Sequence, residues 1–187
     1  MRKLILASFS PRRKELLGRL NIPFIVKGSN VDETINESLS FEERLIDLAY
    51  SKAKAVFDEN QDAVVIGCDT TVALDEKILG KPVDYEDAYK MLMSFSDRPQ
   101  RVYSSLCIMD RNKTIKKLTY SDVYFKPLTK EMVEEYLSYN EWQDKAGAYG
   151  IQGKAIDLID HYEGDINVII GFPLSTVEEI LKTEFDF

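Results

Sequence analysis

The chain has 187 residues, 44% of them hydrophobic and 30% charged, which is the composition of an ordinary globular protein. Its net charge of -8 argues against general nucleic-acid binding, since that function favours a basic surface. No apolar run approaches the ~18 residues of a membrane span, and the N-terminus lacks the pattern of a signal peptide. We therefore expect a single domain over residues 1–187, in the cytoplasm, with no membrane or nucleic-acid partner.

Residues 4–20 predict a strand, a tight turn and a helix. Ser10 is a good N-cap, Pro11 suits the first helical position, and three leucines then form an apolar stripe. Arg12 and Arg13 fall in the first turn, where the positive end of the helix dipole prefers acidic residues. Backbone N–H groups at a helix start, together with two guanidinium groups, would hold a phosphate, so this pattern favours an anion site.

Strand and capping patterns predict the elements that follow. Residues 23–28 predict a second strand and residues 30–40 a loop. Ser40 and Glu43 have the spacing of a capping box, which predicts a helix that ends near Asp58.

The rest of the chain mixes strands and helices without strict alternation. The predicted elements are, in order, a buried strand over 63–74, a turn and short return strand over 75–82, a helix capped by Asp84, strands over 101–110 and 114–125, a helix from Thr129 to Tyr139, a glycine-rich loop over 144–155, apolar segments over 156–160 and 166–170, and a final helix boxed by Ser175 and Glu178. We expect an α/β fold in which a mixed, twisted sheet is flanked by helices, with a cleft between two lobes.

Cysteine and histidine usage narrows the chemistry. Cys68 and Cys107 are the only cysteines, and both stand in apolar stretches, so we expect them to be reduced and buried. His161 is the single histidine, which argues against a His-based zinc site or a Ser-His-Asp triad. Its polar neighbours predict a surface position.

Lys52 stands out on the long predicted helix. Its position is near the centre of the apolar stripe that contains Leu45, Ala49 and Val56. A lysine in the middle of a buried face needs a partner or a ligand, unless its stem carries the charge past the helix edge. Lys54, on the far side of the helix, is predicted to be solvated.

Three further places offer polar chemistry. Asp69 and Thr70 follow an apolar run, and a carboxylate at a strand end suits a metal ligand, a general base or a cap. Lys81 follows a glycine that allows close backbone approach, although the Walker pattern is absent. Gln152 lies in the glycine-rich loop, where its amide could read a base edge or the loop could be a structural turn. The whole set predicts a polyphosphate site with a metal, without separating hydrolysis from nucleotidyl transfer.

Four ordered stretches resemble the signature blocks of the Maf family: LASFSPRRKELL, GCDTTV, LGKP and DKAGAYGIQG. Maf proteins are nucleoside triphosphate pyrophosphatases that were once described as septum formation inhibitors. The resemblance implies an α/β fold related to the inosine triphosphate pyrophosphatases and a homodimer. It also implies cleavage between the α- and β-phosphates of a nucleoside triphosphate, with a divalent metal such as Mg²⁺ or Mn²⁺.

The resemblance also assigns roles to single residues. Asp69 would accept the proton of the attacking water. The residues that would hold the phosphates are Ser8, Arg13, Lys52 and Lys81. Glu33 and Asp69 would lie near the metal. The positions linked to base choice, in the branch that acts on dTTP and UTP, are Arg12, Thr70 and Gln152.

The chain departs from the family pattern in two places. Cys68 stands where alanine is usual. The family stretch L-S-G-R-x-H-x-V is FSDRPQRV here, so that Asp97 and Gln100 replace its glycine and histidine while Arg98 and Val102 remain. These changes leave the four main blocks intact and leave the role of this stretch open.

Two other functions stay open at this point. A nucleotidyltransferase also uses a metal and a basic N-terminal loop, although that loop is usually longer and richer in glycine. A nucleotide-binding regulator of cell division would bind without turnover. Product analysis on a panel of nucleotides separates these functions from a pyrophosphatase.

Overall fold

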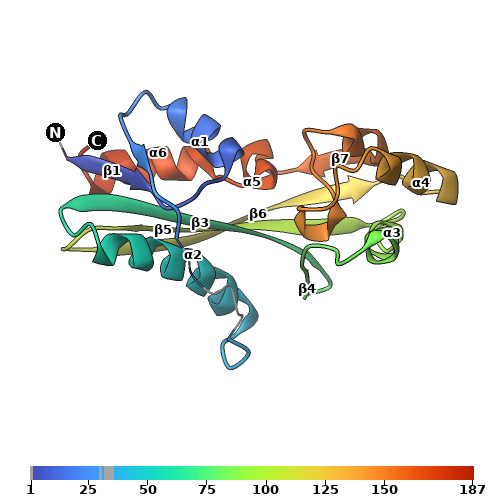
Figure 1. Ribbon diagram of the computed structural model, residues 1–187, viewed down its shortest axis with the longest axis horizontal. Coiled ribbons are helices and arrows are strands. Elements are labelled where there is room, and N and C mark those ends of the chain that lie inside the picture. The colour runs from blue at the N-terminus through green and yellow to red at the C-terminus, as the bar shows by residue number, and fades with distance from the viewer. Residues whose placement is uncertain (1, 30, 32–35) are drawn as a thin grey trace. The chain divides into compact units, whose positions relative to one another are not determined.

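A computed structural model describes residues 2–29, 31 and 36–187 (Figure 1). The strands are β1 Lys3–Leu6, β2 Ile25–Val26, β3 Ala63–Leu74, β4 Lys77–Leu79, β5 Pro99–Met109, β6 Thr114–Phe125 and β7 Ile159–Glu163. The α-helices are α1 Pro11–Gly18, α2 Phe41–Asp58, α3 Tyr85–Met93, α4 Lys130–Ser138, α5 Ile166–Ile170 and α6 Leu174–Glu184. Two short 3₁₀ helices, η1 Ala146–Ala148 and η2 Lys154–Leu158, interrupt the glycine-rich stretch.

The strands of the described residues form one mixed, seven-stranded sheet in the order β2-β1-β3-β5-β6-β7, with β4 paired to β3. β1 pairs in parallel with β2 and β3, whereas β4 is antiparallel to β3 and β7 is antiparallel to β6. The predicted α/β class and mixed sheet are therefore confirmed. The predicted cleft between two lobes stays a prediction.

The chain divides into two compact units. Unit 1 comprises residues 1–69, 104–119 and 171–187, and unit 2 comprises residues 70–103 and 120–170. Three strands, β3, β5 and β6, contribute residues to both units.

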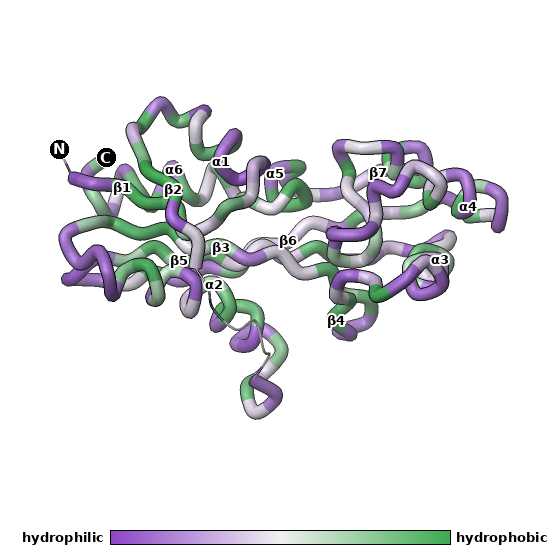
Figure 2. Tube along the Cα trace, in the orientation of Figure 1, coloured by the Kyte–Doolittle hydropathy of each residue, from purple (hydrophilic) through white to green (hydrophobic). Residues whose placement is uncertain are grey.

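Unit 1 buries both faces of its strands. In Figure 1, α2 lies on one side of β1 and β3, and α1 and α6 lie on the other. Hydrophobic residues run along these strands (Figure 2). On the α2 side, Ile5 and Val65 of the sheet belong to the same buried cluster as Ala49 and Ala53 of the helix. Because helices cover both faces of β1 and β3 in this unit, the sequences of these strands are nearly continuous apolar runs and do not alternate with polar residues.

The capping box of α2 forms as predicted. The Ser40 Oγ accepts a hydrogen bond from the Glu43 backbone N–H at 3.4 Å, and the Glu43 carboxylate accepts one from the Ser40 N–H at 3.0 Å. The helix then runs to Asp58, which is the predicted end. These two bonds fix the start of the helix and hence the position of every later residue along it.

Gly67 sets how closely α2 approaches β3. A Cβ at this position would lie 2.3 Å from the Ala49 carbonyl oxygen and 2.6 Å from the Ala53 backbone nitrogen. Both contacts are to helix backbone, which cannot rotate away. Only glycine therefore allows the helix to lie this close to the strand.

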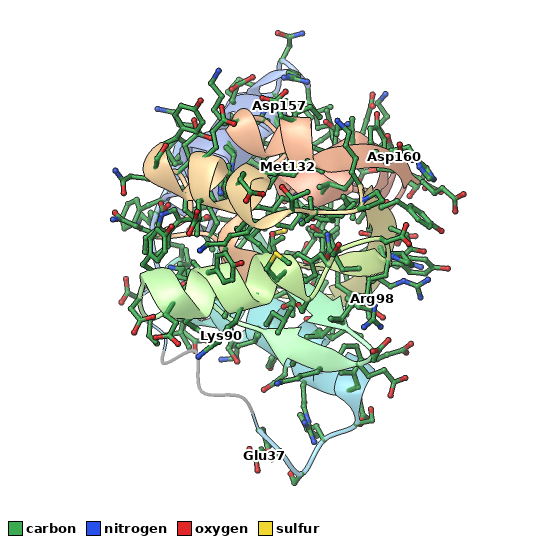
Figure 3. All side chains as sticks on the ribbon, turned by 90° about the vertical axis from the view of Figure 1, so that its right-hand side faces the viewer. Glu37, Lys90, Arg98, Met132, Asp157 and Asp160 are labelled. Atoms are coloured by element: carbon green, nitrogen blue, oxygen red, sulfur yellow. The ribbon has the colours of Figure 1, made fainter. Side chains whose placement is uncertain are left out.

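Unit 2 has an aromatic core. The Phe125 ring centroid lies 5.1 Å from that of Phe95 and 5.1 Å from that of Tyr149. Helices α3 and α4 pack against each other in this unit, as the neighbouring ribbons that carry Lys90 and Met132 show (Figure 3). His161 is exposed, as predicted.

Two predicted boundaries are wrong. The second strand is limited to Ile25–Val26. The final helix has no capping box, because it begins at Leu174 with Pro173 at its N-cap position and no side-chain cap. Proline cannot donate a backbone hydrogen bond but its fixed φ suits a helix start, so Ser175 lies inside the first turn instead of before it.

Candidate active site

The buried lysine of α2 has an acidic partner. Lys52 Nζ donates a hydrogen bond to Asp69 Oδ1 at 2.5 Å. The two side chains are only 11% and 12% exposed. The structure therefore confirms that Lys52 belongs to the buried stripe, and the partner that such a lysine needs is Asp69. Lys54 is 45% exposed and pairs with Asp58 on the solvated side of the helix, as predicted.

The interpretation of Asp69 as a strand-end residue is wrong, because β3 continues to Leu74. The feature that changes near Asp69 is the neighbour of β3. The parallel pairing with β1 ends at Ile66, and the antiparallel pairing with β4 begins at Val72. Asp69 lies between these two pairings, beyond the carboxyl end of β1. In α/β sheets this is the place where ligands bind, although the strand that carries the residue has not ended.

Arg13 is held on the other side of the same backbone. Its guanidinium donates to the Cys68 carbonyl at 2.7 Å, to the Gly171 carbonyl at 3.0 Å and to the Ser8 Oγ at 3.3 Å. Because Cys68 precedes Asp69, Arg13 and the Lys52–Asp69 pair act on the same short stretch of β3. Unit 1 therefore brings together four of the predicted residues: Ser8, Arg13, Lys52 and Asp69.

The start of α1 has the predicted form but no side-chain cap. Ser10 occupies the N-cap and Pro11 the first helical position, and the Ser10 N–H donates to the Ser8 Oγ at 3.2 Å. The first turn contains no acidic residue, and Arg12 is exposed there. The positive end of the helix dipole and the charge of the exposed Arg12 both favour an anion at this helix start.

Both cysteines are buried and free, as predicted. Burial raises the pKa of the Cys68 thiol to about 11, against the opposing effect of the Arg13 charge. The Asp69 and Lys52 charges also act on this thiol. Cys68 is therefore a neutral spacer between the charged groups and not a nucleophile at neutral pH.

In unit 2, a backbone hydrogen bond joins two of the predicted motifs. The Gly147 N–H in the glycine-rich stretch donates to the Gly80 carbonyl at 3.1 Å, immediately before the exposed Lys81. Gly147 has a φ of +68°, and a Cβ there would lie 2.8 Å from Val72 Cγ1. Both the backbone conformation and the lack of space require glycine.

Gln152 lies at the exposed tip of a turn. The Gly153 N–H donates to the Gly150 carbonyl at 3.1 Å and closes the turn around Ile151 and Gln152. The Glu141 carboxylate accepts from the Lys154 N–H at 2.7 Å and holds the chain beyond it. Gln152 is therefore presented to solvent by a segment whose ends are fixed.

Three predicted residues belong to unit 2: Thr70, Lys81 and Gln152. Thr70 is joined to Asp69 directly by the chain, whereas Lys81 and Gln152 are presented by the two hydrogen-bonded loops. The sequence predicted no role for Gly67, the first residue of the GCDTTV block, or for the Gly171 carbonyl, and both shape the site through backbone contacts. Gly171 has a φ of +114°, a backbone conformation that favours glycine. The presence of a glycine at this position was the only sequence signal for it.

The described residues include no group of three or more His, Cys, Asp or Glu that could hold a metal. Of the two predicted ligands, Asp69 lies among these residues and Glu33 lies outside them. Mg²⁺ usually keeps several waters and is bound by one or two carboxylates together with substrate phosphates. The single carboxylate of Asp69 fits a cation that arrives with a triphosphate.

A pocket of about 260 Å³ in unit 2 borders the end of the glycine-rich stretch, since Lys154 is part of its lining. Its lining includes Met132 and Glu135 of α4 together with Asp157 of η2. Figure 3 labels Met132 and Asp157 on this side of the unit. The lining contains none of the predicted site residues.

No helix of the described residues is both long and apolar enough to cross a membrane.

Two curated proteins are similar to this chain over nearly its full length. A dTTP/UTP pyrophosphatase of Bacillus cytotoxicus is 41% identical over 186 residues, which cover 100% of this chain and 97% of that protein. A dTTP/UTP pyrophosphatase of Bacillus cereus strain Q1 is 41% identical over 182 residues, which cover 97% and 95%. A crystal structure of a Vibrio cholerae protein aligns with 74% of this chain at 12% identity and a TM-score of 0.37, and we draw no conclusion from it.

Residues 3–184 match the protein family described as Maf-like protein. This match includes the buried Lys52–Asp69 pair, the Arg13 contacts and the two joined loops of unit 2. The chain therefore belongs to the Maf family.

Proposed function

We propose that this protein is a nucleoside triphosphate pyrophosphatase that hydrolyses dTTP and UTP to the monophosphate and pyrophosphate. The observation that carries the proposal is the buried Lys52–Asp69 ion pair at 2.5 Å, beside an arginine and a helix N-terminus. Such a set combines a base with groups that neutralise anions. The names of the Bacillus relatives support the choice of dTTP and UTP.

In the proposed reaction, water attacks the α-phosphorus. The Asp69 carboxylate accepts a proton from this water as the new P–O bond forms. The bond between the α-phosphorus and the bridging oxygen breaks, and pyrophosphate leaves with the electron pair. Lys52 holds the Asp69 carboxylate in place and contributes positive charge beside the phosphates.

Besides a base, the proposed reaction requires positive charge at the site, because a triphosphate carries about four negative charges near neutral pH. Arg13 and Ser8 are proposed to bind the phosphates in unit 1, and Lys81 in unit 2. A bound Mg²⁺ or Mn²⁺, held by Asp69 and Glu33, would neutralise further phosphate charge. The net charge of -8 makes these local cations necessary, since the protein as a whole repels the substrate.

Base choice is proposed to depend on Arg12, Thr70 and Gln152. Uracil and thymine share one Watson–Crick edge, with acceptors at O2 and O4 and a donor at N3. The Gln152 amide can meet the donor and one acceptor together. Cytosine reverses the pattern at N3 and C4, and an amide that is free to turn over can match either pattern. Discrimination therefore requires that the loop hold the Gln152 amide in one orientation, and each group of cytosine then left unpaired costs about 1–3 kcal/mol.

We also propose that residues 1–187 act as one catalytic domain, in a cytoplasmic homodimer. The family match over residues 3–184 supports the single domain, since it includes residues of both units. A nucleoside triphosphate is then the partner, and neither nucleic acid nor a membrane is required.

A nucleotide panel tests the proposed function. The protein is incubated with Mg²⁺ or Mn²⁺ and with dTTP, UTP, CTP, GTP or 7-methyl-GTP, and both products are measured. We expect pyrophosphate and monophosphate in equal amounts, fastest from dTTP and UTP. Binding without turnover would favour a regulator, and turnover only with a second nucleotide-accepting substrate would favour a nucleotidyltransferase. A preference for the guanine nucleotides would contradict the assignment of Gln152.

A further inference from the structure

Gln100 is a buried polar side chain that the proposed reaction does not use. It is 2% exposed at the start of β5, where the Maf pattern has histidine. Its Nε2 donates a hydrogen bond to the Tyr149 hydroxyl. Its Oε1 is buried, and within the described residues it has no hydrogen-bond partner. A buried amide with one unsatisfied end destabilises the fold, so a purely structural role explains this residue poorly.

The partner of Gln100 is itself tightly placed. Tyr149 is 5% exposed, and its ring makes edge contacts with the rings of Phe125 at 5.1 Å and Phe95 at 6.1 Å. These apolar ring contacts keep the Tyr149 ring buried, but they are weakly directional, so the ring could still slide within its own plane. The hydrogen bond from Gln100 supplies that missing constraint, because it is directional.

Tyr149 leads directly into the Gln152 turn. Its backbone is extended, and the turn closed by Gly150 and Gly153 follows at once. Beyond the turn, Glu141 fixes the chain through the Lys154 N–H. The turn is therefore held at two ends. At the first end, the Tyr136 hydroxyl donates to the Ala148 carbonyl at 3.1 Å and fixes the backbone, and the Tyr149 side chain is a second anchor.

We propose that Gln100 is a positioning residue for base selection, which acts through Tyr149 to hold the Gln152 turn in place. The proposal rests on the proposed function, in which Gln152 reads the pyrimidine edge. In this role Gln100, which is buried, would touch neither the substrate nor the reacting atoms. A misplaced Gln152 would weaken the distinction between UTP and CTP, whereas the chemical step at Asp69 would continue.

The test compares Gln100→Met/Tyr149→Phe, Gln100→His and wild type. Replacing both buried partners with apolar groups leaves no polar atom unpaired, so the melting temperature is expected to stay near that of wild type. Met fills the space but is flexible, so it fixes no single ring position. In the double variant, the ratio of kcat/KM for UTP to kcat/KM for CTP is expected to fall about tenfold, which corresponds to ~1.4 kcal/mol. Most of this change is expected in the KM for UTP.

Two further variants sharpen the result. Gln100→His can still donate from a ring nitrogen to the Tyr149 hydroxyl, so the ratio is expected to be kept. Gln61→Met makes the same substitution at an exposed glutamine and is expected to change neither ratio nor stability. A double variant that keeps the wild-type ratio would overturn the proposal, and so would a Gln100→His variant that loses it.

Amide hydrogen exchange separates this proposal from the proposed function. The Gly153 N–H, which closes the turn, is expected to exchange at least about tenfold faster in the double variant at an unchanged melting temperature. Unchanged exchange overturns the positioning role, whatever the activity. A third outcome is also informative: the double variant exchanges faster, but the wild-type enzyme does not prefer UTP over CTP. That result would support the positioning role of Gln100 and contradict the proposed base choice.

Discussion

Asp69 carries the chemical step in this account, and its ion pair with Lys52 decides how it can be tested. Asp69→Asn keeps the shape and still lets the amide oxygen accept from Lys52 Nζ, so the fold should persist. The amide cannot take a proton, and loss of an essential general base costs roughly 10²–10⁴-fold in rate. We expect kcat for UTP to fall by at least about 10²-fold while nucleotide binding, measured by calorimetry, remains.

Asp62→Asn is the matched control, because Asp62 is exposed in the turn before β3. It should leave kcat and KM unchanged. Near wild-type turnover in Asp69→Asn would remove Asp69 from the mechanism.

Cys68 gives a pH prediction for stability. Burial raises the pKa of this thiol from 9.0 to about 11, so the unfolded chain loses the proton at lower pH than the folded protein does. The stabilisation is complete below pH 9 and is lost as the pH rises from about 9 to 11. In that window this residue should lower the free energy of unfolding by roughly 1 kcal/mol per pH unit.

Urea denaturation between pH 8 and 11 measures this effect when wild type is compared with Cys68→Ala. Cys107, whose pKa is also raised by burial, to about 12, is present in both proteins. The difference between the two curves therefore isolates Cys68. Parallel curves would show that the Cys68 thiol has the same pKa in both states.

At the scale of elements, the distance between α2 and β3 decides whether Lys52 reaches Asp69. Gly67→Ala would push the helix away, since its Cβ would meet the backbone of Ala49 and Ala53. Overpacking of this kind typically costs about 1–3 kcal/mol. We expect a lower melting temperature and a kcat reduced about tenfold or more, because the ion pair would be stretched.

Gly18→Ala is the control for a glycine-to-alanine change. Gly18 ends α1, and a Cβ there would meet no atom within 4 Å. Alanine should leave activity unchanged and stabilise by up to about 1 kcal/mol, since it restricts the unfolded chain. A Gly67→Ala protein with wild-type activity would show that this helix distance does not control the site.

Most elements could be predicted because their signals are local. The capping box predicts the start of α2, and the apolar stripe predicts that Lys52 is buried. The partner of Lys52 could not be predicted, because the contact depends on how two elements pack. The strand over 63–74 was itself predicted, so the interpretation of Asp69 as a strand-end residue disagreed with a local signal that the structure confirms. The change of neighbour along β3 near Asp69 could not be predicted, because it depends on strand pairing.

At the scale of the whole molecule, the resemblance to a family predicted the reaction and the roles of single residues, which the periodicity of apolar residues could not predict. The four motifs indicate the Maf family, and the match over residues 3–184 confirms it. The geometry of unit 1 then joins Arg13, Lys52 and Asp69, which lie far apart in the sequence. The buried contact of Gln100 with Tyr149 had no signal in the sequence beyond its departure from the motif.

The central claim is that water activated at Asp69 attacks the α-phosphorus of the nucleotide. Hydrolysis of UTP in ¹⁸O-labelled water tests it most directly, with mass spectrometry of both products after limited turnover. We predict one ¹⁸O atom in the monophosphate and none in the pyrophosphate, with product formation reduced by at least about 10²-fold in Asp69→Asn. Label in the pyrophosphate, or release of inorganic phosphate instead, would contradict the account.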